Sequence, residues 1–115
     1  MAGPKKEKTM SNYITNLFSL DGKTALIAGG AGAFGRDIAR AFAKAGAFVI
    51  VHDLAQDRLD EVAATFMAEG LVFNGMQADL STAEGCAGLV ARAKEVTGTI
   101  DILVNLQGTN KRKRI

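Results

Sequence analysis

The stretch TALIAGGAGAFG, residues 24–35, begins the pattern that decides the fold predicted for this 115-residue chain. Its first five residues form an apolar run of strand length. Four glycines fall within the next seven residues. Apolar residues then recur at helical spacing up to Ala45. A strand, a glycine-rich turn and a helix are therefore expected to follow one another directly.

The same alternation continues to the end of the chain. Further strands are predicted at 48–52, 71–78 and 100–106, with amphipathic helices between them. Such alternation is typical of an α/β fold with a parallel sheet and right-handed crossovers. We predict the N-terminal part of a doubly wound, Rossmann-type sheet with strand order 3-2-1-4, its third helix on the opposite face from the first two. That helix should start with a Ser81–Glu84 capping box and bury Cys86.

Composition and charge exclude several classes of protein. The length suits one domain, of which residues 1–16 are expected to be a disordered basic leader. Residues 21–109 carry a net charge of −4, whereas the first 20 carry +2 and the last six +4. A nucleic-acid-binding face would be positive, so no such partner is expected. The terminal KRKRI is interpreted as a solvated terminus, with a localisation or nucleic-acid tail as the alternative.

Cysteine count and hydropathy narrow the class further. A single cysteine, Cys86, excludes an internal disulfide and a multi-cysteine metal site, and no metal is predicted. No apolar run reaches the roughly 18 residues of a membrane span, and the N-terminus has no signal-peptide core. We therefore expect a cytoplasmic protein without a membrane partner.

The glycine-rich turn has a specific chemical use. Glycine permits positive φ angles and lets another group approach the backbone closely. The helix that follows presents unpaired N–H groups and the positive end of its dipole. Together they favour a bound pyrophosphate. The turn lacks the Gly-Lys-Ser/Thr ending of an ATPase-type phosphate loop, so a dinucleotide is indicated.

An acidic residue follows the second predicted strand. Asp53 stands 24 residues after Gly29, directly behind the run FVIVH. A carboxylate there typically bonds the adenosine ribose and repels a 2′-phosphate. The adjacent Leu54 adds no positive charge, so NAD is favoured over NADP, although Arg36 could reach a phosphate. The alternative role for Asp53 is a turn or helix cap, and His52 is interpreted as structural or surface-lying, not as a catalytic base.

These residues resemble the short-chain dehydrogenase/reductase family, whose fingerprint after the first strand is Thr-Gly-x-x-x-Gly/Ala-x-Gly. The chain has AGGAGAFG at residues 28–35. Ala28 departs from the pattern, because the family prefers a threonine whose hydroxyl helps brace the turn. The resemblance assigns the phosphate side of the site to Gly29, Gly32, Ala33, Phe34 and Gly35.

Two further stretches carry the resemblance, which covers residues 17–115 as a partial NAD(P)-binding domain. ADLS at 78–81 implies that Asp79 meets the adenine amino group and Leu80 packs beside the ring. DILVNLQG at 101–108 is similar to the family's Asp-x-Leu-Val-Asn-Asn-Ala-Gly. Asn105 and Gly108 match, whereas Gln107 places a longer polar side chain near the cofactor. NLFSLDGKTALI and GTNKRK also resemble the sugar-acid branch, such as gluconate 5-dehydrogenase and 2-deoxygluconate dehydrogenase.

The family's catalytic serine and Tyr-x-x-x-Lys have no counterpart in this sequence. The one tyrosine, Tyr13, is followed four residues later by Leu17, so no catalytic residue is predicted. We expect a chain truncated after its fourth strand, which is left as an exposed apolar edge, and marginal stability.

The resemblance thus implies the cofactor-binding half of an NAD(P)-dependent oxidoreductase acting on an alcohol or ketone, inactive by itself. Its full-length relatives are expected to be homo-oligomeric. The alternative is a non-catalytic dinucleotide-binding or regulatory module.

Overall fold

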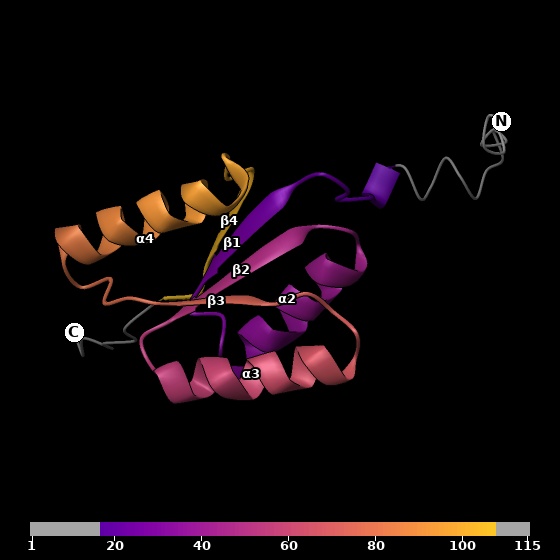
Figure 1. Cartoon of the computed structure of the whole chain (residues 1–115), viewed down its shortest axis with the longest axis horizontal. Helices are drawn as coiled ribbons and strands as arrows, with labels where there is room; N and C mark the ends of the chain where they lie inside the picture. Colours follow the sequence, from indigo (N-terminus) through magenta and orange to yellow (C-terminus); the bar gives the residue numbers. More distant parts are fainter. Residues whose placement is uncertain (1–16, 108–115) are drawn as a thin grey trace, which may run out of the picture.

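The computed structural model describes residues 17–107 of the chain, and its elements alternate regularly between strand and helix (Figure 1). In chain order they are β1 (Thr24–Ala28), α2 (Ala33–Lys44), β2 (Phe48–Asp53), α3 (Gln56–Ala68), β3 (Asn74–Gln77), α4 (Ala83–Thr97) and β4 (Ile102–Asn105). The predicted strands and helices are all present, although β3 and β4 are shorter than expected. The leader 1–16, Gly108 and the KRKRI run lie outside the described residues.

The four strands form one parallel sheet in the order β3-β2-β1-β4. This confirms the predicted fold class and strand order. Register places Ala28 of β1 opposite His52 of β2 on one side and opposite Asn105 of β4 on the other. The carboxyl ends of three strands therefore stand in one row.

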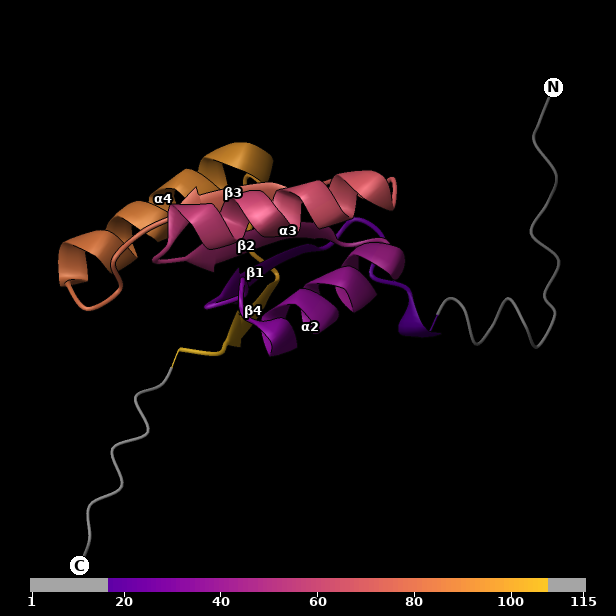
Figure 2. The same cartoon turned by 90° about the horizontal axis from the view of Figure 1, so that it is seen from below.

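Two apolar cores lie on opposite faces of the sheet. One contains Ile27 and Val51 together with Phe66 of α3, and α2 packs on the same face. The other contains Leu26 and Ile50 beneath Leu89 of α4. Consecutive strand residues point to opposite faces, which is why both faces of β1 and β2 are apolar. Figure 1 shows α2 and α3 below the sheet and α4 above it, as predicted, and in the view from below in Figure 2 α3 lies in front of β3.

The start of α4 corrects two expectations. Thr82, not Ser81, caps the helix, because its Oγ1 accepts the N–H of Gly85 at 3.0 Å. Ser81 instead bonds Asp79 through both its N–H and its hydroxyl. Cys86 is exposed, not buried. It lies near the start of α4, where its thiol donates to the Leu80 carbonyl oxygen at 3.3 Å and its side chain lines an open hollow instead of the core.

Strand β4 forms one edge of the described sheet. Leu103, at its centre, is 65% exposed. The predicted apolar edge is therefore present in residues 17–107. The expected marginal stability stays a prediction.

Candidate functional site

The turns that follow the four strands meet at the carboxyl edge of the sheet, as parallel pairing requires. The glycine turn follows β1, and Asp53 ends β2. Residues 78–81 follow β3, and residues 106–107 follow β4. The fold therefore gathers at one edge the motifs that sequence analysis had placed on separate elements.

The glycine turn brings the start of α2 against the backbone behind β1. Gly29 has φ of +76°, a left-handed conformation that favours glycine. A Cβ on Gly35 would lie 2.5 Å from the Gly30 Cα, so only glycine permits this approach of helix to turn. Gly32 is the N-cap of α2, no side chain caps it, and the first turn holds no acidic residue. The first N–H groups of α2 are therefore suited to an external anion.

Asp53, at the end of β2, is buried, with only 7% of its surface exposed. Its Oδ1 accepts the N–H of Ala55 at 3.0 Å, a turn that leads into α3. This geometry agrees with the turn alternative. It leaves Oδ2 without a hydrogen-bond partner among the described residues, so the same carboxylate could also accept from a ribose hydroxyl.

A hollow of about 470 Å³ lies beside these turns, between the loops after β3 and β4. Five predicted site residues line it: Leu54, Asp79, Leu80, Asn105 and Gln107. Ala78, Ser81 and Cys86 complete the lining. The Ser81 hydroxyl donates to Asp79 Oδ1 at 2.6 Å and the Ser81 N–H at 2.9 Å, and these bonds hold the pKa of the Asp79 carboxyl below its ordinary 3.8. The carboxylate is thus a charged acceptor at neutral pH.

Gln107 lines this hollow and lies next to the glycine turn. Its N–H donates to Asn105 Oδ1 at 3.0 Å. A Cβ on Gly29 would lie 3.3 Å from both the backbone nitrogen and the Nε2 of Gln107. The polar side chain that departs from the family pattern therefore stands directly against the turn.

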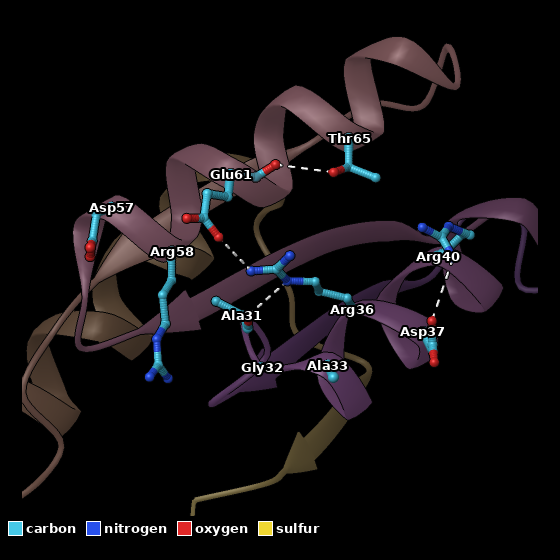
Figure 3. Close-up of a pocket in the computed structure, with 10 residues that line it drawn as sticks. All are labelled: Ala31, Gly32, Ala33, Arg36, Asp37, Arg40, Asp57, Arg58, Glu61 and Thr65. Atoms are coloured by element: carbon cyan, nitrogen blue, oxygen red, sulfur yellow. Dashed lines mark hydrogen bonds and ion pairs between the residues drawn. The ribbon is translucent and has the colours of Figure 1, made fainter.

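The remaining predicted residues lie elsewhere. Phe34 is 77% exposed on the first turn of α2 and lines no hollow described for residues 17–107. Gly32 and Ala33 line a second hollow of about 820 Å³ between α2 and α3 (Figure 3). Gly108 lies outside the described residues.

Arg36 stands in that second hollow. Its Nε donates to the Ala31 carbonyl oxygen at 2.9 Å, and its Nη2 pairs with Glu61 of α3 at 3.0 Å (Figure 3). The guanidinium therefore ties the glycine turn to α3. Both contacts compete with any phosphate for this cation.

His52 is the site residue whose role sequence reasoning missed. It is fully buried, as the structural interpretation allowed. Its ring bonds the Gly29 N–H on one side and the Ala78 carbonyl oxygen on the other. The only sequence signal was a polar residue at the end of the apolar run FVIV.

The described residues contain neither a membrane-spanning helix nor a cluster of metal ligands. Between residues 17 and 107, no helix is long and apolar enough to cross a membrane. The same residues contain no group of three or more His, Cys, Asp or Glu side chains that could hold a metal ion.

Several known proteins are similar to this chain in sequence and in fold. The curated relative UcpA, an oxidoreductase of Salmonella typhimurium, is 42% identical over 89 residues, which cover 77% of this chain and 34% of UcpA. The crystal structure of 2-keto-3-deoxy-D-gluconate dehydrogenase from Streptococcus agalactiae matches with a TM-score of 0.82 and 34% identity, over 92% of this chain and 40% of that one. A Pseudomonas aeruginosa RhlG/NADP active-site complex matches with a TM-score of 0.73 and 35% identity, over 80% and 37%.

The matched proteins are longer than this chain, which spans about a third of the curated relatives. The family described as short chain dehydrogenase matches residues 23–115, which include the glycine turn, Asp53 and both later motifs. Sequence match, strand order and the turns gathered at the carboxyl edge thus agree, and the chain belongs to the short-chain dehydrogenase family.

Proposed function

We propose that this chain is the cofactor-binding half of an NAD-dependent oxidoreductase that acts on an alcohol or a ketone. The observation that carries the proposal is the meeting of three features at one edge of the sheet. The uncapped start of α2 suits a pyrophosphate. The buried carboxylate of Asp53 suits a ribose diol. The hollow bordered by Asp79 and Leu80 suits an adenine ring.

The preference for NAD over NADP rests on the end of β2. The RhlG complex contains NADP, so a similar fold accommodates the 2′-phosphate. In this chain the residue at that point is the acidic Asp53, followed by the apolar and exposed Leu54. Arg36, the nearby cation, is already bonded to Ala31 and Glu61. A 2′-phosphate would therefore meet the charge of Asp53, and Arg36 could balance it only by giving up these two bonds.

Binding can be measured directly on the full 115-residue chain. NADH fluorescence should change saturably on titration. Cys86 offers an independent signal, because it is the only cysteine in the sequence, is exposed and lines the hollow. NADH should slow its labelling by a thiol reagent with the same concentration dependence. The proposal would be refuted if millimolar NADH gave no saturable fluorescence change and did not slow the labelling of Cys86.

The role of Asp53 has its own test. Asp53→Asn removes the charge at the ribose position and should shift the NADPH-to-NADH affinity ratio toward NADPH by about tenfold, or roughly 1.4 kcal/mol. Asp60→Asn is the matched control, because Asp60 is an exposed carboxylate on α3 and lines neither hollow. An unchanged ratio in Asp53→Asn, or an equal change in the control, would remove Asp53 as the selecting residue.

For the whole protein we propose a sugar acid as substrate, supported by the likeness to 2-keto-3-deoxy-D-gluconate dehydrogenase. The chain by itself is proposed to bind without turnover, since its sequence holds no Tyr-x-x-x-Lys. NAD reduction by this chain with gluconate or 2-keto-3-deoxygluconate would contradict that. A Tyr-x-x-x-Lys encoded after Ile115 would favour the enzyme over a binding module, and its absence the reverse.

A further inference from the structure

We propose that His52 is the positioning residue that holds the cofactor turn, in place of the hydroxyl that Ala28 lacks, and that it links this turn to the adenine-side loop. The inference rests on the proposed function, because the turn matters only where a dinucleotide binds. His52 ends the buried run of β2 beside Asp53 and is 0% exposed. It is therefore placed under the site, not in it.

Two consecutive N–H groups of the turn are held by this one residue. The Gly29 N–H donates to His52 Nδ1 at 3.1 Å. The next N–H, of Gly30, donates to the His52 carbonyl oxygen at 2.9 Å. The direction in which the chain leaves β1 is fixed by both bonds, one of which depends on the side chain.

The other ring nitrogen reaches a different loop. His52 Nε2 lies 2.8 Å from the Ala78 carbonyl oxygen, at the start of the segment that lines the adenine-side hollow. Gly29 and Ala78 are thus joined through one imidazole although 49 positions of sequence separate them. The pyrophosphate and adenine portions of the site therefore share a support.

These partners assign the tautomer. An amide N–H only donates and a carbonyl oxygen only accepts, so Nδ1 is the acceptor and the proton lies on Nε2. Both nitrogens of the neutral ring are thereby occupied. His52 has no free nitrogen for proton transfer to a substrate, which separates a positioning role from that of a catalytic base.

The register explains how the histidine substitutes for a residue on another strand. Ala28 and His52 are directly paired across β1 and β2, and paired residues of parallel strands point to the same face. A hydroxyl at position 28 and an imidazole at position 52 therefore approach the turn from the same side. Ala28 is itself buried at 5% exposure, so its methyl group leaves the polar contact to His52.

The test uses substitutions at position 52 that separate the hydrogen bond to Gly29 from the hydrogen bond to Ala78. Asn places Oδ1 near the position of histidine Nδ1, and Gln places Nε2 near that of histidine Nε2. His52→Asn should keep the Gly29 bond and bind NADH within about threefold of the parent chain. His52→Gln and His52→Ala should bind about tenfold more weakly, the effect of one lost hydrogen bond. Adding Ala28→Thr to His52→Ala should restore most of the affinity.

The NADH affinities of these variants can refute the proposal in two ways. Equal NADH affinity in the parent, Asn, Gln and Ala proteins would overturn the proposal, as would a larger loss in Asn, which keeps the Gly29 bond, than in Gln, which loses it. If Ala28→Thr failed to restore NADH affinity to the His52→Ala protein, the inference that His52 acts in place of a hydroxyl at position 28 would be wrong. Circular dichroism identifies any variant that does not fold.

A measurement on the unmutated chain keeps the proposal testable if the variants do not fold. A scalar coupling across the Gly29 N–H···Nδ1 bond, with the His52 proton on Nε2, is expected in ¹⁵N NMR spectra. A proton on Nδ1 would contradict the inference. Failure of the parent chain to bind NADH would refute the proposed function while leaving this coupling intact, so the two failures are distinguishable.

Discussion

Substituting Gly35 by alanine tests the close approach of α2 to the glycine turn. The added Cβ would lie 2.5 Å from the Gly30 Cα and 2.6 Å from its carbonyl carbon and oxygen. Ordinary contacts begin near 3.4 Å, so backbone must move by almost an ångström. Overpacking of this kind costs about 1–3 kcal/mol, and the upper half of that range applies because a backbone segment cannot rotate away.

The substitution also has a favourable term. Alanine is preferred over glycine within a helix by about 0.8–1 kcal/mol, and Gly35 lies within α2. The expected net loss for Gly35→Ala is therefore about 1–2 kcal/mol of the free energy of unfolding. With a urea m-value of about 1 kcal/mol per M for so small a domain, the unfolding midpoint should fall by about 1–2 M.

Far-UV circular dichroism can follow this transition, because helices form much of the described chain. Gly88→Ala is the matched control: Gly88 lies in α4, and a Cβ there meets nothing within 4 Å. That variant should gain about 0.5–1 kcal/mol. If Gly35→Ala were as stable as the parent while Gly88→Ala showed its gain, the inferred helix–turn contact would be wrong.

Three further predictions concern α4, the hollow and the sheet edge. Thr82→Ala should lower the free energy of unfolding by about 1 kcal/mol through loss of the cap on Gly85, and a larger loss in Ser81→Ala would return the cap to Ser81. Ser81→Ala should instead raise the Asp79 pKa toward 3.8 in a ¹³C NMR titration, since the hydrogen bond from the Ser81 hydroxyl favours the carboxylate. The contribution of this bond to stability is present at neutral pH and is lost as the pH falls below 3.8. An unchanged Asp79 pKa in the variant would contradict this. Leu103→Lys should change stability by less than about 0.5 kcal/mol yet reduce self-association in sedimentation experiments, because Leu103 is 65% exposed; unaltered association would show that this edge does not drive it.

The parts of the fold that sequence predicted are those that depend on local order. The run from Thr24 to Ala28 is apolar at every position after Thr24, and in the structure every one of its residues is buried. The glycines behind it mark the turn because Gly29 needs a positive φ angle and Gly35 has no room for a side chain. Parallel topology then sends the end of every strand to one edge, so a motif's position in the chain was enough to place it.

The parts that could not be predicted depend on which neighbour a polar group finds. Ser81 and Thr82 are both good helix caps. Thr82 is the cap in the structure, because its Oγ1 accepts the Gly85 N–H while the Ser81 hydroxyl is held at Asp79. Cys86 fits a helical apolar stripe, but it lines an open hollow and is exposed. Periodicity describes one element by itself and contains no information about where the surface beneath that element stops.

His52 shows the same limit more sharply. Consecutive residues of a strand face opposite sides, so a slip of β2 by one position against β1 would turn Val51 or Asp53 toward the glycine turn and His52 away from it. With Val51 there, the Gly29 N–H would lose its side-chain acceptor. With Asp53 there, a charged carboxylate would lie at the turn and would no longer stand at the mouth of the site. The observed pairing of Ala28 with His52 avoids this, and it also leaves Asp53 one step further along, at the mouth of the site. The register of two strands thus determines both the support of the turn and the position of the acid that is proposed to select the cofactor.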